Sequence, residues 1–193
     1  RPKGAILTHF NLINAAKNLT EQEEMKKNDD YFSFLPLSWV NEKVVSTVVP
    51  LIIGFATNFP EKPHTVMVDL REIGPQTLLA PPRVYQSLMS NFIIRMEGAS
   101  WFKLKVYGLF KKYGDKKAVA DANNEVLSGM DKFMYFLGDA IIFSAIRDHL
   151  GLGRLRRAYV AGAALQQDAF HFYHSIGVNL KQTYGGTEVA GIA

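Results

Sequence analysis

The 193-residue chain contains no cysteine. Disulfide bonds and thiolate chemistry are therefore excluded as sources of stability or reactivity. The absence of cysteine favours a reducing compartment without requiring one, so we expect a cytoplasmic protein.

Long apolar runs are also missing. The most hydrophobic stretch, residues 44–57, is interrupted by Ser46, Thr47 and Pro50 and is too short to cross a bilayer. No signal peptide, internal repeat or low-complexity tract is visible, although a chain that begins inside a motif could not show a signal peptide. The 48% hydrophobic content is enough for a sizeable core.

Neither sign of charge dominates. The 22 basic and 18 acidic residues leave a net charge of +4, which suits anionic substrates without demanding nucleic acid. Arg154, Arg156 and Arg157 form a small basic run, but no nucleic-acid-binding module accompanies it. We therefore expect no nucleic-acid partner.

Glycine and polar residues gather near the C-terminus. The strand-like residues 178–181 lead into Gln182-Thr183-Tyr184-Gly185-Gly186-Thr187-Glu188. We interpret this as a strand that ends in a tight turn, where two glycines supply positive φ and let the backbone approach a ligand. A threonine hydroxyl beside a glutamate carboxylate suits a phosphate and its Mg²⁺. The alternative is an ordinary turn after a strand.

Strand-like and helix-like segments alternate along the chain. Candidate strands are 5–8, 31–35, 55–58, 76–80, 155–160 and 179–183. Candidate helices are 10–25, 42–53, 64–73 and 167–176, with a mostly helical stretch 83–150 broken at Gly98, Gly114 and Gly129. This alternation predicts an α/β fold: a mostly parallel sheet with helices on both faces, whose ligands bind at the carboxyl ends of the strands.

Three segments, in this order, carry a family resemblance. Arg1-Pro2-Lys3-Gly4 and the residues to His9 resemble the end of the Ser/Thr/Gly-rich phosphate loop of the adenylate-forming (AMP-binding) superfamily. Residues 158–165, Ala-Tyr-Val-Ala-Gly-Ala-Ala-Leu, resemble the segment that packs along the adenine ring. Residues 184–188 resemble a further signature of that superfamily. Agreement of all three in family order is unlikely to arise by chance.

The interior resembles one branch of that superfamily. Residues 32–39, Phe-Ser-Phe-Leu-Pro-Leu-Ser-Trp, followed by Glu42-Lys43-Val44, are similar to a stretch of long-chain acyl-CoA synthetases. Residues 69–75 and 80–85 look like the segments that follow it in those enzymes. Many relatives carry histidine or another residue in place of Trp39, a position often near the acyl pocket. Trp39 is thus a predicted pocket residue, and chain-length specificity does not transfer.

The resemblance implies a ligase. It would activate a long-chain fatty acid with ATP to an acyl-adenylate and then form the CoA thioester, releasing AMP and pyrophosphate, with Mg²⁺ as cofactor. The alternatives are a related ligase for another carboxylic acid and an inactive nucleotide-binding or structural fragment. We expect residues 1–193 to form one partial domain, the middle of the AMP-binding domain, without the start of the phosphate loop or a C-terminal domain. Such a piece would be inactive alone.

The resemblance also implies individual roles. Thr187 and Glu188 would be catalytic, with Thr187 bonded to a phosphate oxygen and Glu188 a ligand of Mg²⁺. Tyr184 would stack on the adenine opposite the small-residue segment 162–164. The predicted ATP/AMP-binding residues are Lys3, Gly162, Ala163, Ala164, Gln182, Thr183, Tyr184, Gly185, Gly186 and Thr187, and the predicted acyl-pocket residue is Trp39.

Plainer interpretations stand beside these roles. Lys3 is alternatively a solvated loop lysine, and segment 162–164 a tightly packed strand end. Trp39 fits a core aromatic as well as a pocket wall. For Glu42 we favour an exposed position on a surface helix over a motif role.

Two further patterns are weaker. Asp168, His171 and His174 recur at helical spacing like a metal-binding face, but a solvated face is the favoured interpretation. Residues 101–113 mix aromatics with lysines, as in a helix that lies on anionic lipid, and an ordinary amphipathic helix with a solvated basic face is favoured there. Peripheral contact with the inner face of a membrane therefore stays open, and no oligomeric state is predicted.

Overall fold

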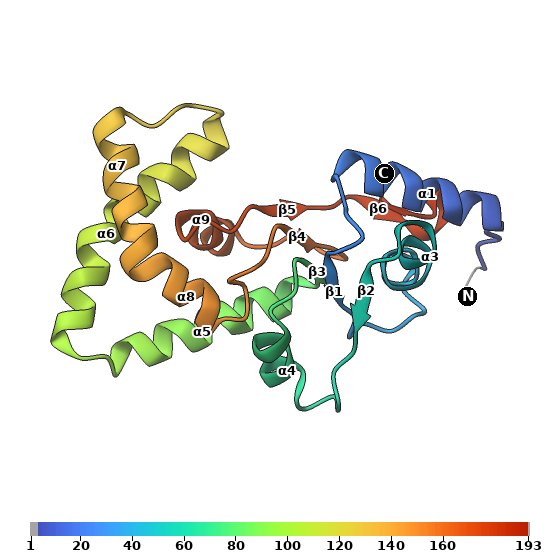
Figure 1. Cartoon of the computed structure of the whole chain (residues 1–193), viewed down its shortest axis with the longest axis horizontal. Helices are drawn as coiled ribbons and strands as arrows, with labels where there is room; N and C mark the ends of the chain where they lie inside the picture. The colour runs from blue at the N-terminus through green and yellow to red at the C-terminus, as the bar shows by residue number, and fades with distance from the viewer. Residues whose placement is uncertain (1–3, 193) are drawn as a thin grey trace.

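The computed structural model describes residues 4–192, so the predicted site residue Lys3 lies outside the described part of the chain. A parallel five-stranded sheet runs through the molecule in the order β2-β1-β3-β4-β5 (Figure 1). The strands are β1 (Asp30–Phe32), β2 (Ala56–Asn58), β3 (Thr77–Ala80), β4 (Arg157–Val160) and β5 (Leu180–Gln182). The predicted α/β fold is confirmed, and the corresponding predicted strands are present with shorter bounds.

Helices cover both faces of the sheet because successive side chains of a strand point to opposite sides. On β3, Leu78 packs into one hydrophobic cluster and Leu79 into the other. The first cluster includes residues of α4 (Val66–Ile73), α5 (Pro82–Glu97), α8 (Ser144–His149) and α9 (Gln167–Ser175). The second includes residues of α1 (His9–Gln22), α2 (Val40–Lys43), η1 (Val44–Val48) and α3 (Val49–Ile53).

A helical arm extends the first face between α5 and β4. It consists of α6 (Trp101–Asn123), α7 (Gly129–Gly138), the π-helix η2 (Asp139–Phe143) and α8. The predicted breaks at Gly98 and Gly129 are confirmed, since α5 ends before Gly98 and α7 begins at Gly129. The predicted break at Gly114 is wrong. A Cβ at Gly114 would lie 2.6 Å from the Ser175 carbonyl oxygen, so this glycine lets α6 approach α9.

The N-terminal prediction also needs correction. Residues 5–8 form no strand; instead Thr8 is the N-cap of α1, and its hydroxyl oxygen accepts a hydrogen bond from the Asn11 amide at 3.2 Å. The Asn11 side chain accepts in return from the Thr8 amide at 3.0 Å. This reciprocal capping box satisfies donors that a strand would have paired with a neighbour.

The helix predicted over 42–53 is present despite Pro50. Its central turn is a π-helix, in which the Val49 amide donates to the Val44 carbonyl oxygen five residues earlier. Pro50 lies in the first turn of α3. Proline has no backbone N–H to donate, and this costs least in the first turn of a helix, where the N–H groups have no partner within the helix.

A buried ion pair joins the chain before β1 to the first residue of β4. Arg157 and Asp29 are both buried, with Nη1 and Oδ2 2.7 Å apart. Arg157 also donates to the carbonyl oxygens of Glu23 and Glu24, each at 2.6 Å. Arg154 pairs with Asp30 at 2.9 Å, so the basic run makes contacts within the chain.

Candidate active site

The small-residue loop, residues 161–166 after β4, is held in shape by side chains from β5 and the residue after it. The Gln182 amide nitrogen donates to the Ala163 carbonyl oxygen at 3.1 Å, and its oxygen accepts from the Leu165 amide at 3.2 Å. The Thr183 hydroxyl donates to the Val160 carbonyl oxygen at 2.8 Å. Both side chains therefore support the loop, whose central residues 162–164 are exposed.

Trp39 lies against this loop. Its indole carbons Cη2 and Cζ3 are 3.5 Å from the position that a Cβ would take at Gly162, where φ is 92°. Glycine adopts this backbone conformation readily, and a larger residue here would bring its Cβ against the indole. At 40% exposure Trp39 is not a buried core aromatic. The structure thus brings the predicted acyl-pocket residue into contact with the predicted adenine segment.

A hairpin follows β5. The strand β6 (Gly185–Gly186) pairs antiparallel with β7 (Gly191–Ile192), and the 3₁₀ turn η3 (Thr187–Val189) joins them. The predicted positive φ at the two glycines of β6 is wrong: Gly186 is extended at φ −155°, because it pairs with Gly191. The left-handed backbone lies instead at Ala190 and Gly191, with φ of 61° and 121°.

The hairpin presents the predicted catalytic residues to solvent. Thr187 and Glu188 are adjacent in the turn and exposed, and Tyr184 just before the hairpin is 86% exposed. Because β4 and β5 are parallel neighbours, the loop after β4 and the hairpin after β5 leave the same edge of the sheet. Two of the three segments that carry the family resemblance, 158–165 and 184–188, thus lie at the carboxyl ends of strands, whereas the described part of the first segment, residues 4–9, follows no strand.

The first turn of α2 links the loop and the hairpin. Trp39 precedes α2 and contacts Gly162, while Asn41 Oδ1 lies 2.6 Å from the position of a Cβ at Gly191. Asn41 Oδ1 is buried and makes no hydrogen bond within residues 4–192. Sequence reasoning missed Asn41, although its place two residues after Trp39 in the same motif was an available signal.

Glu42 is buried, so the predicted exposed position on a surface helix is wrong. Its two carboxylate oxygens accept hydrogen bonds from the Tyr31 hydroxyl and the Ser33 hydroxyl, at the end of β1. Burial raises the pKa of Glu42 above its ordinary value of 4.5, although the two hydrogen bonds act in the opposite direction. The two hydroxyls give the carboxyl the partners that a buried polar group needs, and they tie α2 to β1.

The donor set at the hairpin is compatible with Mg²⁺. Within the described residues no group of three or more His, Asp or Glu side chains is arranged to hold a metal. Mg²⁺, however, is commonly bound by one or two protein carboxylates together with substrate phosphates and water. An exposed single carboxylate at Glu188 fits that arrangement.

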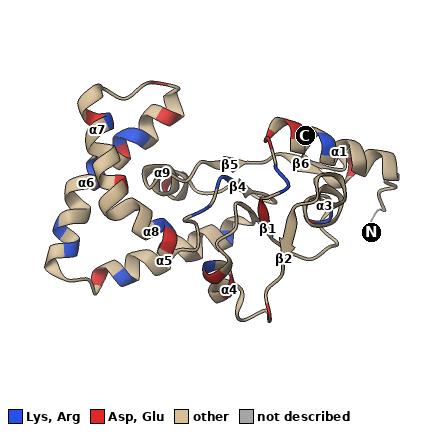
Figure 2. Ribbon diagram, in the orientation of Figure 1, with Lys and Arg blue, Asp and Glu red and all other residues tan. Residues whose placement is uncertain are grey.

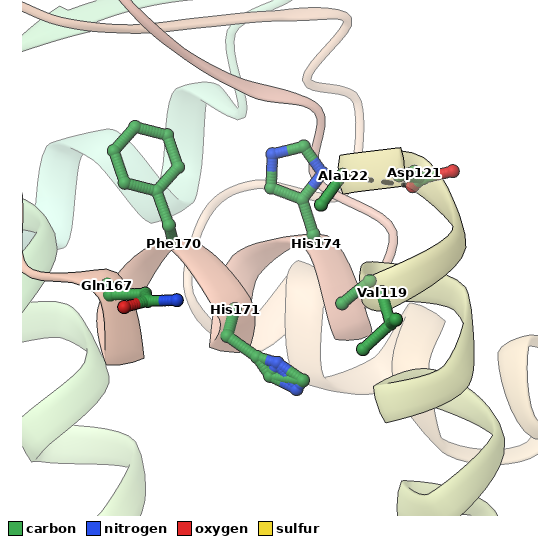
Figure 3. A pocket seen from close by; sticks show the side chains of 8 residues that line it. Val119, Asp121, Ala122, Gln167, Phe170, His171 and His174 are labelled. Atoms are coloured by element: carbon green, nitrogen blue, oxygen red, sulfur yellow. Dashed lines mark ion pairs between the residues drawn. The ribbon is translucent and has the colours of Figure 1, made fainter. Parts of the chain in front are cut away.

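A separate pocket of about 380 Å³ lies between α6 and α9 (Figure 3). His174 Nδ1 is 3.7 Å from an Asp121 carboxylate oxygen, and His171 Nε2 is 3.3 Å from one of Asp115. The two histidines are partly exposed and contact acidic residues of α6, while Asp168 is exposed. None of the residues lining this pocket belongs to the loop or the hairpin.

The sequence model of the AMP-binding enzyme family matches residues 1–193. The chain belongs to the AMP-binding enzyme family.

Individual relatives carry more specific names. A long-chain-fatty-acid–CoA ligase of Rattus norvegicus is 26% identical over 198 residues, covering 98% of this chain and 29% of the rat protein. A ligase of the same description from Gallus gallus is also 26% identical, over 99% of this chain and 26% of its own length. The peroxisomal long-chain acyl-CoA synthetase 7 of Arabidopsis thaliana is 25% identical over 98% of this chain and 26% of its own length. The chain thus spans about a quarter to a third of these relatives.

Proposed function

We propose that the protein containing this chain activates a long-chain fatty acid with ATP and transfers the acyl group to CoA. In the first step a carboxylate oxygen of the acid attacks the α-phosphorus of ATP, and pyrophosphate leaves. In the second step the thiol of CoA attacks the carbonyl carbon of the acyl-adenylate, so that the thioester forms and AMP leaves. The names of the relatives support the acid and CoA as substrates.

The contact of Trp39 with Gly162 is the observation that carries this proposal. It joins the motif predicted for the acyl pocket to the loop predicted for adenine at one edge of the sheet. An acyl-adenylate needs both environments side by side, because its apolar chain and its nucleotide are covalently joined. We place the adenine between the Tyr184 ring and the exposed backbone of residues 162–164, with the acyl chain near Trp39.

We assign the hairpin residues the task of offsetting negative charge in the first step. Both reactants are anions, so the site must neutralise charge and align the attack. In our proposal the Thr187 hydroxyl donates to a phosphate oxygen, and the Glu188 carboxylate holds Mg²⁺, which when bound offsets phosphate charge. Lys3, outside the described residues, would lie near the same phosphates. Gln182 and Thr183 act by holding the loop rather than by direct contact.

The test is a fatty-acid-dependent pyrophosphate-release assay on the intact protein as the cell makes it. Thr187→Ala and Glu188→Gln should each lower the rate by about 100-fold or more, because each removes a group that acts on developing charge. Val189→Ala, at a 57% exposed side chain in the same turn, is the matched control and should retain activity. Circular dichroism of every variant checks the fold.

Substrate choice is tested by calorimetric titration with a non-hydrolysable long-chain acyl-adenylate analogue and with AMP. Tighter binding of the acyl form supports an acyl pocket at Trp39, and Trp39→Ala should remove that preference without removing AMP binding. AMP binding with no acyl preference would point to a ligase for another carboxylic acid. Full activity in the Thr187 and Glu188 variants would overturn the roles assigned to those residues. If the folded protein bound neither ligand, the alternative of a structural module without ligase activity would be favoured.

A further inference from the structure

The first half of α6 combines apolar exposure with one sign of charge. Residues 101–114 include four lysines, at positions 103, 105, 111 and 112, and no acidic residue. Trp101 is 69% exposed, Phe102 67% and Leu109 51%. These are large apolar side chains that a helix in contact only with water would rarely present together.

The exposed residues share one side of the helix. At 100° per residue, Trp101, Phe102, Lys105, Leu109 and Lys112 fall within roughly one third of the circumference. Phe110, on the opposite side, is buried in the core. The outer surface of α6 is therefore a stripe of aromatic and aliphatic side chains interleaved with lysines, and Figure 2 shows the basic residues along this helix.

The end of α5 adds one exposed apolar residue close to the start of α6 in the chain. Ile94 is 64% exposed, and only residues 98–100 separate α5 from α6. The next residue, Arg95, hydrogen-bonds through its guanidinium to the ring nitrogen Nε2 of His149. Between Ile94 and Lys112 in the sequence, the one acidic residue is Glu97. We define the corner patch as Ile94, Trp101, Phe102, Lys105, Leu109 and Lys112.

We propose that the corner patch docks on an anionic membrane surface. Tryptophan, phenylalanine and leucine on a lysine-rich helix are the residues that place a helix in the plane of the bilayer interface. Lysine stems extend along apolar surface while their ammonium groups reach polar headgroups, and Lys105 Nζ already lies 4.4 Å from the centre of the Trp101 ring. Within residues 4–192 no helix has the length and apolar character needed to cross a bilayer.

The corner patch differs in charge from a second exposed apolar surface on the helical arm. On α7, Met130 is 70% exposed and Phe133 56%, but Asp131 lies between them and only Lys132 is basic there. Anionic headgroups would attract the lysine stripe of α6 and gain little from α7. The α7 surface is therefore a matched control of similar apolar exposure and different charge. The inference goes beyond the proposed ligase activity and does not depend on it.

The experiment is co-sedimentation of the intact protein with vesicles of phosphatidylcholine alone or with 30% phosphatidylserine. We expect binding to the serine-containing vesicles that falls as salt rises. Trp101→Ser/Phe102→Ser should lower the partition coefficient by about tenfold or more. Lys105→Glu/Lys112→Glu should abolish the preference for phosphatidylserine.

Two controls match these variants. Met130→Ser/Phe133→Ser removes equivalent apolar surface from α7, and Lys26→Glu/Lys62→Glu makes the same change in net charge at exposed lysines elsewhere. Both should bind like the parent. Equal loss in patch and control variants would overturn the proposal, as would failure of the parent to bind. A concentration-dependent dimer that disappears only in the patch variants, without vesicle binding, would assign the surface to a second copy instead.

Discussion

Ion pairs in the sheet and in the helical arm differ in their distance along the chain and in their contact with water. Arg157 and Asp29 are 128 residues apart and nearly excluded from solvent, with side-chain exposures of 8% and 5%. On the arm, Lys111 pairs with Asp115 one turn away at 2.8 Å, with exposures of 52% and 34%. Ion pairs thus join distant segments of the chain in the sheet, whereas on the arm they join neighbouring residues on the surface of one helix.

The physical consequence lies in what remains when one partner is removed. A charge left inside the protein keeps its desolvation cost and loses the attraction that offset it. A charge left on the arm is exposed to water, which hydrates it, so the free energy of unfolding changes little. We therefore expect the sheet to depend strongly on a few polar groups and the arm on its apolar contacts.

Arg157→Ala gives the largest expected effect. It leaves buried Asp29 with only the longer contact to Arg156 at 3.5 Å and removes the donor to two backbone carbonyls, so the free energy of unfolding should fall by about 3 kcal/mol. Urea unfolding followed by circular dichroism measures this. Arg154→Ala is the control, because that side chain is 56% exposed and its pair with Asp30 should contribute about 1 kcal/mol or less. Equal losses in the two variants would contradict the contrast between buried and exposed pairs.

Glu42→Ala should have the next largest effect, about 2 kcal/mol, because it leaves the Tyr31 and Ser33 hydroxyls buried without their acceptor. Glu42→Gln keeps an acceptor and should cost less. The two variants separate the loss of hydrogen bonds from the loss of an ionisable group.

The same position predicts a pH dependence. Since the pKa of Glu42 is raised in the folded state, the folded protein binds more protons than the unfolded one above pH 4.5. The Glu42 contribution to stability is therefore present below pH 4.5 and is lost as pH rises through the folded pKa. Glu42→Gln lacks this loss, so its deficit relative to the parent should shrink between pH 4 and pH 8 in urea titrations. A deficit that grows with pH would show that the folded protein prefers the carboxylate.

Lys117→Ala should have the smallest effect, about 0.3–0.5 kcal/mol, since its pair with Asp121 joins partly exposed side chains one helical turn apart. The same urea unfolding experiment measures it, and 1 M salt should erase the difference by screening. A loss above about 1 kcal/mol would mean that the arm, like the sheet, relies on its ion pairs.

Local patterns predicted most of the secondary structure. The apolar runs of β3 and β4 and the glycines at positions 98 and 129 act through bonds and side chains within a few residues. The predicted strand at 5–8 failed because Thr8 and Asn11 form a capping box, a pattern the prediction did not weigh. The predicted helix break at Gly114 was wrong because this glycine allows close approach to α9, some sixty residues later in the chain.

By itself the sequence determined the α/β alternation and the order of the segments after β4 and β5, since hydrophobic periodicity is a local property of the chain. Tertiary structure decided the burial of Glu42, the extended backbone of Gly186 and the contact of Trp39 with Gly162. Each of these rests on a partner outside the element itself. The hydroxyl partners of Glu42 are 9 and 11 residues away, Gly186 pairs with the next strand of its hairpin, and the loop that Trp39 meets comes more than a hundred residues later. Solvent exclusion and close packing act only once those partners meet, so no local pattern specifies them.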